Sequence, residues 1–175
     1  MGNGKLKAAV VDAGPLIHLA EIGCLRLLRA FGTLWVPHAV WLETAEQDRL
    51  SQNDLSEVPN ILKCLAPQLE MTRFIRENNL TDLHAGEQEC LYLCREKTIT
   101  TLLTDDLAVR DAARRLNLVP VGSLGIVVMA YKQKDISLPE AERHIANLYE
   151  VSSLFVTRDI ADMAIEQLRS TPPKR

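Results

Sequence analysis

The sequence predicts an α/β fold in which helices cover both faces of a parallel sheet. Short runs of aliphatic residues alternate along the chain with longer segments whose apolar residues recur at helical spacing. This alternation is typical of right-handed βαβ crossovers, which bury parallel strands on both faces. The length of 175 residues suits one domain with an ordinary core.

The strand candidates are short, and each ends at a polar or turn-forming residue. "KAAVVD" ends on an aspartate, "TLWVP" on a proline, "ITTLLTDD" on two aspartates, and "VPVGS" on a glycine and a serine. Four strands are therefore expected, at residues 7–12, 33–37, 99–106 and 119–123.

The connections carry the helical patterns. The first is interrupted at Gly23, which predicts two short helices there. The segment after the aspartate pair places Val109, Ala112, Ala113 and Leu116 on one inward face. Helices are expected at residues 13–31, 38–47, 66–79, 82–96, 107–118 and 124–135, with one or two more beyond Pro139.

Two regions are less regular. Residues 48–62 are rich in polar and turn-forming residues and are expected to form a surface loop. The chain ends in "STPPKR", which is expected to be an exposed tail. We expect a catalytic domain at residues 1–138 and a helical extension at 139–175 that packs on the same domain.

The composition limits the class of protein. It is 47% hydrophobic, 25% charged and 5% aromatic, which indicates a soluble protein with an aliphatic core. No apolar run reaches the roughly 20 residues that span a bilayer, and the start lacks a signal-peptide pattern. A cytoplasmic location is expected. The net charge of −3 disfavours broad capture of nucleic acid but allows a local basic patch.

The four cysteines do not form a metal-binding pattern. They show no CxxC spacing, and the four histidines form no HExxH motif. We expect them to be small core residues in a reducing compartment. They are Cys24, Cys64, Cys90 and Cys94.

Acidic residues follow two of the expected strands. Asp12 ends the first strand, and Asp105 and Asp106 end the third. In an open α/β sheet the crevice at the carboxyl ends of the strands is the usual position of a site. If these strands are neighbours, the three carboxylates approach one another.

Two helical glutamates are candidates for the same site. Glu87 opens the stripe that continues through Cys90 and Cys94, so it is expected to face inward. Glu89 lies about 200° away on the helix and is expected to face solvent, so that its substitution should have little effect. Glu43 is a weaker candidate in the helix at 38–47.

Structural roles also account for these acids when each is taken alone. Asp12, Asp105 or Asp106 serves as a helix cap, and Asp106 is also spaced for an ion pair with Arg110. Glu43 is equally compatible with a solvated face. Capping does not explain an inward glutamate on a separate helix, so we favour a shared carboxylate site.

A shared carboxylate site implies a cation, because clustered carboxylates raise one another's pKa. Oxygen ligands without cysteine or histidine suit Mg²⁺ or Mn²⁺ rather than zinc. Two such ions can activate water and stabilise the leaving oxygen in phosphodiester hydrolysis.

These residues resemble the PIN-domain family. "VVDAGPLIHLAEIGCLRLL" is similar to its amino-terminal signature. "LHAGEQECLYL" and "LLTDDLAVRDAARRLNLVPVGSLGIVVMAYKQKDI" are similar to the branch with a GE-containing helix, a DDxxxR segment and a G-[ST]-x-G turn. The likeness spans residues 7–137. It implies a three-layer α/β/α sandwich and metal-dependent cleavage of RNA, often by the toxin of a toxin-antitoxin pair.

The resemblance also implies roles for individual residues. Asp12, Glu43 and Glu87 match the first three family acids, and Asp105 or Asp106 matches the fourth. The catalytic candidates are thus Asp12, Glu43, Glu87, Asp105 and Asp106, and the metal ligands are Asp12, Glu87, Asp105 and Asp106. The family often has a hydroxyl residue after the first aspartate, whereas this chain has Ala13 and Gly14. An antitoxin partner and a homodimer are common in the family.

Basic residues near the aspartate pair are candidates for holding phosphate. Arg110, Arg114 and Arg115 lie in the helix that follows, and Ser123 and the amides after it begin another helix. A solvated basic face is the simpler alternative, and Lys132 and Lys134 share that alternative. The substrate-binding candidates are Arg110, Arg114 and Ser123.

A Mg²⁺- or Mn²⁺-dependent ribonuclease is the leading hypothesis. A catalytically weak RNA-binding or partner-binding module on the same scaffold is the main alternative, because of Ala13 and Gly14. A DNA or structure-specific nuclease would use identical chemistry. A phosphatase is disfavoured because it needs a second aspartate two positions after Asp12, where Gly14 stands.

Overall fold

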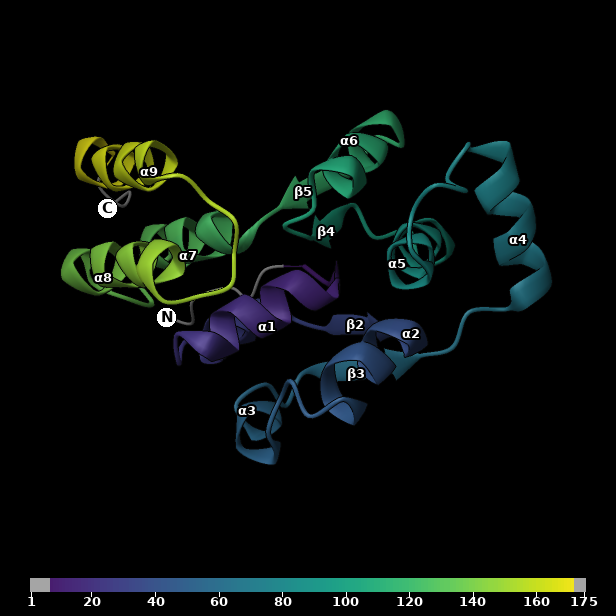
Figure 1. Cartoon of the computed structure of the whole chain (residues 1–175), viewed down its shortest axis with the longest axis horizontal. Helices are drawn as coiled ribbons and strands as arrows, with labels where there is room; N and C mark the ends of the chain where they lie inside the picture. Colours follow the sequence, from purple (N-terminus) through teal and green to yellow (C-terminus); the bar gives the residue numbers. More distant parts are fainter. Residues whose placement is uncertain (1–6, 172–175) are drawn as a thin grey trace.

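The computed structural model describes residues 7–171 and contains a five-stranded parallel sheet in the order β3-β2-β1-β4-β5 (Figure 1). β1 is the central strand and is fully buried, which its uninterrupted apolar sequence allows. It pairs with β2 on one side and β4 on the other. The strands are β1 (Ala9–Val11), β2 (Leu34–Pro37), β3 (Ile61–Cys64), β4 (Thr101–Leu103) and β5 (Val119–Val121).

Helices fill the connections and form two layers around the sheet. α5 packs on β1, β2 and β4, and α6 packs on β5. α1 and α7 pack together on the opposite side (Figure 1), so the predicted three-layer α/β/α fold is confirmed. The helices are α1 (Ala13–Glu21), the 3-10 helix η1 (Leu25–Ala30), α2 (His38–Trp41), the π-helix η2 (Leu42–Glu46), α3 (Gln52–Ser56), α4 (Gln68–Glu77), α5 (Ala85–Glu96), α6 (Leu107–Arg115), α7 (Ser123–Lys132), α8 (Leu138–Glu150) and α9 (Arg158–Ser170).

The break predicted at Gly23 is present. Gly23 has a φ of +64°, a left-handed conformation that glycine adopts without strain, and it separates α1 from η1.

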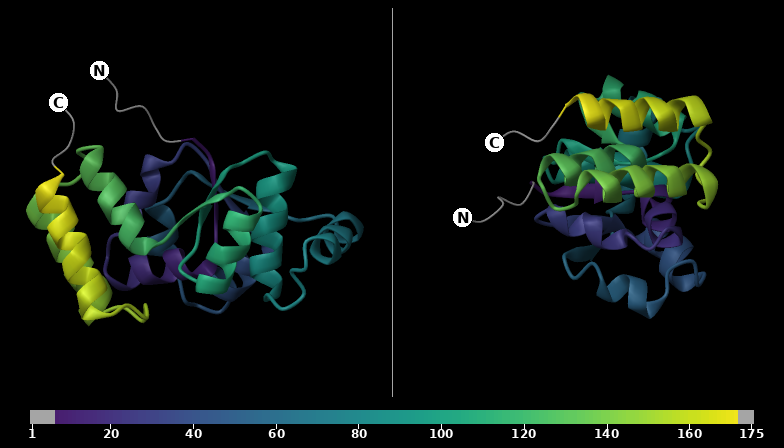
Figure 2. Two further views of the ribbon diagram at one scale, coloured as in Figure 1. Left: turned by 90° about the horizontal axis from the view of Figure 1, so that it is seen from above. Right: turned by 90° about the vertical axis from the view of Figure 1, so that its left-hand side faces the viewer.

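The two carboxyl-terminal helices lie side by side at one end of the molecule (Figure 2). Both pack against α7, and both contribute to the main core. One or two helices were expected in the region from Pro139 onward, and the two helices α8 and α9 are present. The last four residues of the expected tail, like residues 1–6, lie outside the described part of the chain. The buried residues of α8 and α9 include Ala141, Ile145, Leu148, Ala161 and Leu168.

The expectation of a continuous loop at residues 48–62 is wrong, because α3 lies within this range and β3 begins in it. α3 buries no side chain and depends on a capping box between Ser51 and Asp54. β3 is an edge strand whose Leu62 and Lys63 are exposed. Neither element carries an apolar pattern strong enough to distinguish it from a loop.

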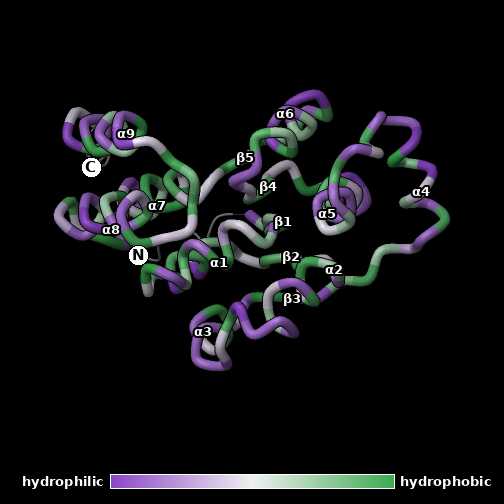
Figure 3. The backbone as a smooth tube through the Cα atoms, viewed as in Figure 1, coloured by the Kyte–Doolittle hydropathy of each residue, from purple (hydrophilic) through white to green (hydrophobic). Residues whose placement is uncertain are grey.

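The interior is aliphatic, as the composition indicates. Hydrophobic residues are concentrated in the strands, whereas α4 and the outer part of α6 are mostly hydrophilic (Figure 3). Cys24, Cys90 and Cys94 are buried free thiols, as expected, and Cys64 is a half-buried one. Within residues 7–171, none of the helices has the length and apolar character needed to cross a bilayer.

Candidate active site

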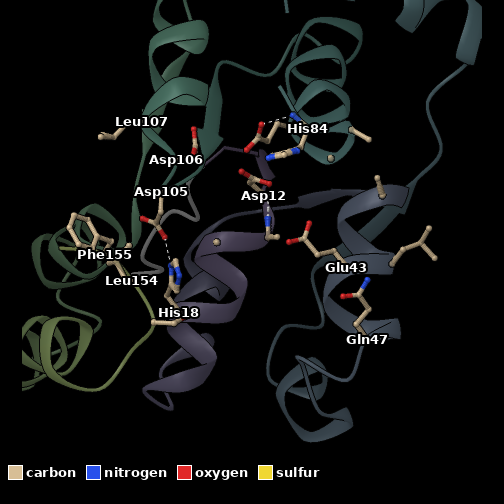
Figure 4. Close-up of a pocket in the computed structure, with 18 residues that line it drawn as sticks. Asp12, His18, Glu43, Gln47, His84, Asp105, Asp106, Leu107, Leu154 and Phe155 are labelled. Atoms are coloured by element: carbon tan, nitrogen blue, oxygen red, sulfur yellow. Dashed lines mark hydrogen bonds and ion pairs between the residues drawn. The ribbon is translucent and has the colours of Figure 1, made fainter. Parts of the chain in front are cut away.

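All five predicted acids line one pocket at the carboxyl ends of the strands, with a volume of about 870 Å³ (Figure 4). Its position follows from the strand order. The chain leaves β1 and β4 toward opposite faces of the sheet, which opens a crevice between these neighbouring strands. The five acids are Asp12, Glu43, Glu87, Asp105 and Asp106.

Asp12 is the buried acid of the pocket. Its Oδ1 accepts a hydrogen bond from the Ala13 N–H at 2.8 Å, so it is the cap of α1 as well as a pocket residue. Burial raises the pKa of Asp12 to about 6, and the charges of Glu87 and Glu43 act in the same direction. The hydrogen bonds that Asp12 accepts oppose this increase but do not cancel it.

Thr104 supplies the supporting hydroxyl that positions 13 and 14 lack. Its Oγ1 donates to Oδ2 of Asp12 at 2.8 Å, and its side chain is fully buried. Val11 and Leu103 are paired in the register of β1 and β4, so the residues after them meet across the sheet edge. Sequence reasoning missed this residue, although Thr104 directly precedes the aspartate pair.

Asp105 links α1 and α7 through hydrogen bonds. It accepts hydrogen bonds from the Ser123 N–H at 2.7 Å and the Ser123 hydroxyl at 2.6 Å, and it is bonded to Nδ1 of His18 at 2.8 Å. Gly122 makes this approach possible, because a Cβ there would lie 2.8 Å from Oδ1 of Asp105. Both Asp105 oxygens are therefore engaged within the protein.

Asp106 is placed differently. Its Oδ1 accepts the Val109 N–H at 2.9 Å and so caps α6. Within residues 7–171 its Oδ2 has no hydrogen-bond partner, and the residue is exposed at the pocket. Of the two adjacent aspartates, Asp106 is the one with an oxygen that accepts no hydrogen bond within residues 7–171.

Glu87 lies in the first turn of α5 and is half-buried. Its Oε2 accepts the His84 N–H at 2.8 Å in a capping box. Burial raises the pKa of Glu87, and the nearby charges of Asp106 and Glu43 add to the increase, while the His84 bond opposes it. The predicted position of Glu87 at a shared site is thus matched by its geometry.

The expectation that Glu89 faces solvent is wrong. Glu89 is only 6% exposed, and its Oε2 accepts the Ala39 N–H at 3.0 Å. The Ala39 amide lies at the start of α2 and has no partner within its own helix. α5 is covered on one side by the sheet and on another by α2, so the helix face that carries Glu89 is buried as well.

Glu43 enters the pocket from the π-helix η2. π-Helical turns are rare and are frequent at functional sites. Gly86 of α5 lies against Val40, and a Cβ at position 86 would be 3.2 Å from a Val40 methyl group. The small residue therefore lets α5 approach α2, which brings Glu43 and Glu87 to one pocket.

The predicted phosphate-binding residues do not gather there. Arg110 donates from Nη1 to the Thr104 carbonyl at 3.4 Å, and Arg114 is exposed and pairs with Asp111 at 2.7 Å. Ser123 is fully buried, and its hydroxyl and N–H are both directed to Asp105. Ser123 therefore supports Asp105 instead of presenting a free helix start.

A family model described as a PIN domain matches residues 8–170, nearly the whole chain. The chain belongs to the PIN-domain family. PIN domains are generally nucleases, which agrees with a pocket of carboxylates at the edge of a parallel sheet. Neither the curated proteins nor the solved structures include a significant match.

The PIN-domain pocket has two chemically different sides. One side is the carboxylate wall, which we define as Asp12, Glu43, Glu87 and Asp106. The other is the apolar rim, which we define as Leu107, Leu154 and Phe155. Figure 4 shows Phe155 and Leu154 on the side of the pocket opposite Glu43. Sequence reasoning missed the rim, because nothing in the sequence indicates that the segment between α8 and α9 reaches the pocket.

The carboxylate wall has the chemistry of a divalent-cation site but not its final geometry. The side chains offer hard oxygen ligands, and their mutual repulsion would be relieved by a cation. Within residues 7–171, no three Asp, Glu, His or Cys side chains already lie close enough together to hold one ion. Ion binding therefore requires these side chains to move toward each other.

Proposed function

We propose that this PIN domain is a Mg²⁺- or Mn²⁺-dependent ribonuclease. The observation that supports this proposal most strongly is the convergence of Asp12, Glu43, Glu87 and Asp106 from four segments on one pocket. The raised pKa values of Asp12 and Glu87 support it further, since burial raises both and the charges of neighbouring acids in the pocket add to the increase. Four acids that line one pocket favour a bound cation once their side chains move toward it.

The residues have separate tasks in this proposal. Asp12 and Asp106 present carboxylate oxygens from the ends of neighbouring strands, and Glu43 and Glu87 present theirs from the neighbouring helices η2 and α5. Thr104 orients Asp12 through its hydroxyl, and Asp105 fixes the strand end that carries Asp106. When bound, divalent ions activate water and stabilise the charge that develops on the phosphate.

The main alternative, a catalytically weak module, loses its motivation. It was based on the missing hydroxyl at positions 13 and 14, and Thr104 supplies a hydroxyl to Asp12 from the adjacent strand. Metal-dependent catalysis also needs oxygen ligands with a well-oriented aspartate among them, whereas binding of RNA or a protein partner does not require such a set.

Purified protein incubated with structured and unstructured RNA, with and without Mn²⁺, tests the proposal. Cleavage is expected only with the ion, and Asp12→Asn should abolish it because a neutral amide is a poor ligand for a hard cation. Equal cleavage by the wild type and the variant would mean a contaminating nuclease and would count against the proposal.

The cellular role is part of the same proposal. A cytoplasmic ribonuclease of this kind would be the toxin of a toxin-antitoxin pair and would act as a homodimer. The reading frame beside its gene should then encode a small antitoxin. Co-expression and co-purification of the two products, followed by measurement of the mass of the complex, test this role.

A further inference from the structure

The connection between α8 and α9 is fixed at the pocket by α1. The Ser153 N–H donates to Oε2 of Glu21 at 2.6 Å, and the Ser153 hydroxyl donates to Oε1 of Glu21 at 2.8 Å. Ser153, Leu154 and Phe155 then line the pocket. Since Glu21 ends α1 and Asp12 caps its start, one helix connects this segment to the carboxylate wall.

Phe155 is held at the pocket with almost none of its own surface covered. It is 97% exposed, while Leu107 on the same rim is 76% exposed. Among the exposed large hydrophobic side chains of residues 7–171, Phe155 has the highest exposed fraction, and it lies beside Leu107 and Leu154 at a pocket mouth. An exposed apolar group of this kind beside a pocket is suited to an external partner. The partner must offer a flat apolar face to the ring.

We propose that Phe155 stacks on an unpaired base of a nucleic-acid strand whose backbone phosphate lies against the carboxylate wall. This inference rests on the proposed nuclease function. A nucleotide has an anionic phosphate at one end, which divalent cations bound by the acids would hold at the carboxylate wall, and an aromatic base at the other end, which suits the apolar rim. The volume of about 870 Å³ falls in the range of about 300–1,000 Å³ typical of small-molecule sites, which accommodates a nucleotide segment.

The geometry favours a single strand. A base within a duplex has both faces covered by its neighbours, whereas an unpaired base offers a face to an aromatic side chain. Stacking of this kind tolerates any base, since every base has a π-face. His84 and Gln47 are exposed in the pocket and provide donors for phosphate or base edges.

A nucleic acid explains the rim better than a protein partner does. A stable protein interface buries about 800 Å² on each side. Beside Phe155 the pocket is lined by acids, and charged residues are depleted from the buried core of protein interfaces. A single base needs only the ring itself and contributes binding energy without a large interface.

The test is binding of a short single-stranded RNA that carries one 2-aminopurine, whose fluorescence falls when it stacks on an aromatic ring. Ca²⁺ replaces Mg²⁺ or Mn²⁺, and the same samples are checked on a gel for intact RNA. The full-length wild type should quench the fluorescence. Phe155→Leu should abolish the quenching and weaken binding by about 5-fold to about 150-fold.

Matched variants separate stacking from general effects. Phe155→Trp should retain the quenching, because it keeps an aromatic face. Tyr149→Leu removes an aromatic ring from α8 that does not line the pocket, and it should bind like the wild type. Glu21→Ala should reduce the quenching amplitude by releasing Ser153, whereas Glu21→Gln, which keeps one acceptor, should retain more of it. Phe155 is exposed, so its variants should keep the wild-type melting temperature.

Three results would overturn the inference. They are equal RNA binding by the wild type and Phe155→Leu, equally tight binding of a fully paired duplex, or a Phe155→Leu variant that binds RNA normally but no longer binds a protein partner. The nuclease proposal fails differently. Normal Mn²⁺-dependent cleavage by Phe155→Leu with an unchanged KM would refute stacking and leave the nuclease intact. Stacking by the wild type without cleavage in any ion would refute the nuclease and leave the stacking.

Discussion

The carboxylate wall and the apolar rim face one pocket but are built in opposite ways. Asp12 is 7% exposed and is held by two hydrogen bonds from the ends of β1 and β4. Phe155 is 97% exposed and depends on the tie between Ser153 and Glu21 for its position. The wall thus comes from the strand ends and from the helices η2 and α5, whereas most of the rim comes from the segment between the two carboxyl-terminal helices.

This difference separates chemistry from recognition. Acids that must hold a cation need fixed supports, and fixed supports are available at the edge of a buried sheet. Residues that select a substrate tolerate a looser segment, because loops can vary without loss of the core. Substitutions in the wall should therefore alter metal binding, and substitution of the buried Asp12 should also alter stability, whereas substitutions in the rim should alter neither.

Asp106→Asn should have the largest effect. Asparagine keeps the cap of α6 but offers a neutral oxygen to the cation, so cleavage should fall on the order of 1,000-fold with an unchanged melting temperature. Asp111→Asn, an exposed change in the same helix, is the control for cleavage assays with Mn²⁺. Full activity of Asp106→Asn would remove Asp106 from the carboxylate wall.

Asp12→Asn should stabilise the metal-free protein. The folded pKa of about 6 lies above the ordinary value of 3.8, so the stability that comes with the protonated form is present below pH 3.8 and lost as the pH rises through 6. At pH 7 the variant should gain up to about 3 kcal/mol, and the gain should disappear near pH 4. Denaturant titrations in EDTA measure it, and a gain that does not depend on pH would contradict the assigned cause.

Glu89→Ala tests the hydrogen bond between α5 and α2, the two helices beside the carboxylate wall. The substitution leaves the Ala39 N–H without its buried acceptor, so unfolding free energy should fall by about 1–3 kcal/mol. Glu89→Gln keeps an acceptor oxygen and should lose less, and Glu70→Gln on the exposed face of α4 should lose nothing. A neutral result for Glu89→Ala would show that α2 does not need this bond.

Leu107→Ala should have the smallest effect on folding. Leu107 is 76% exposed on the rim, so its loss should change the unfolding free energy by less than about 0.5 kcal/mol. Chemical denaturation in EDTA measures this change beside Val109→Ala, a fully buried residue two positions later that should lose a few kcal/mol. Similar losses in both variants would show that the rim is part of the core.

The parts of the fold that depend on strong local patterns could be predicted from the sequence. The alternation of apolar strands and helices located β1, β2, β4 and β5 and most helices, because buried parallel strands leave continuous apolar runs. β3 escaped prediction because an edge strand that exposes Leu62 and Lys63 has no such run. α3 escaped because it contributes nothing to the core.

The residues of the candidate site likewise divide into those that local patterns predict and those that depend on tertiary packing. Asp12, Glu87 and the aspartate pair line one pocket, and their convergence could be expected because strand ends and helical spacing are local properties, whereas their roles stay a prediction. The role of Thr104 depends on the register between two strands, and the burial of Glu89 depends on where α2 packs. Both depend on tertiary contacts, which the hydrophobic periodicity of the sequence does not predict.

The spacing of the wall along the chain has a consequence for synthesis. Asp12 emerges early from the ribosome, and Asp106 emerges only after β4 has been made, yet β4 must dock beside β1 before the two can meet. An unfinished polypeptide therefore lacks the assembled carboxylate wall. A ribonuclease of the kind proposed above would leave the messenger that encodes it intact until translation has nearly finished.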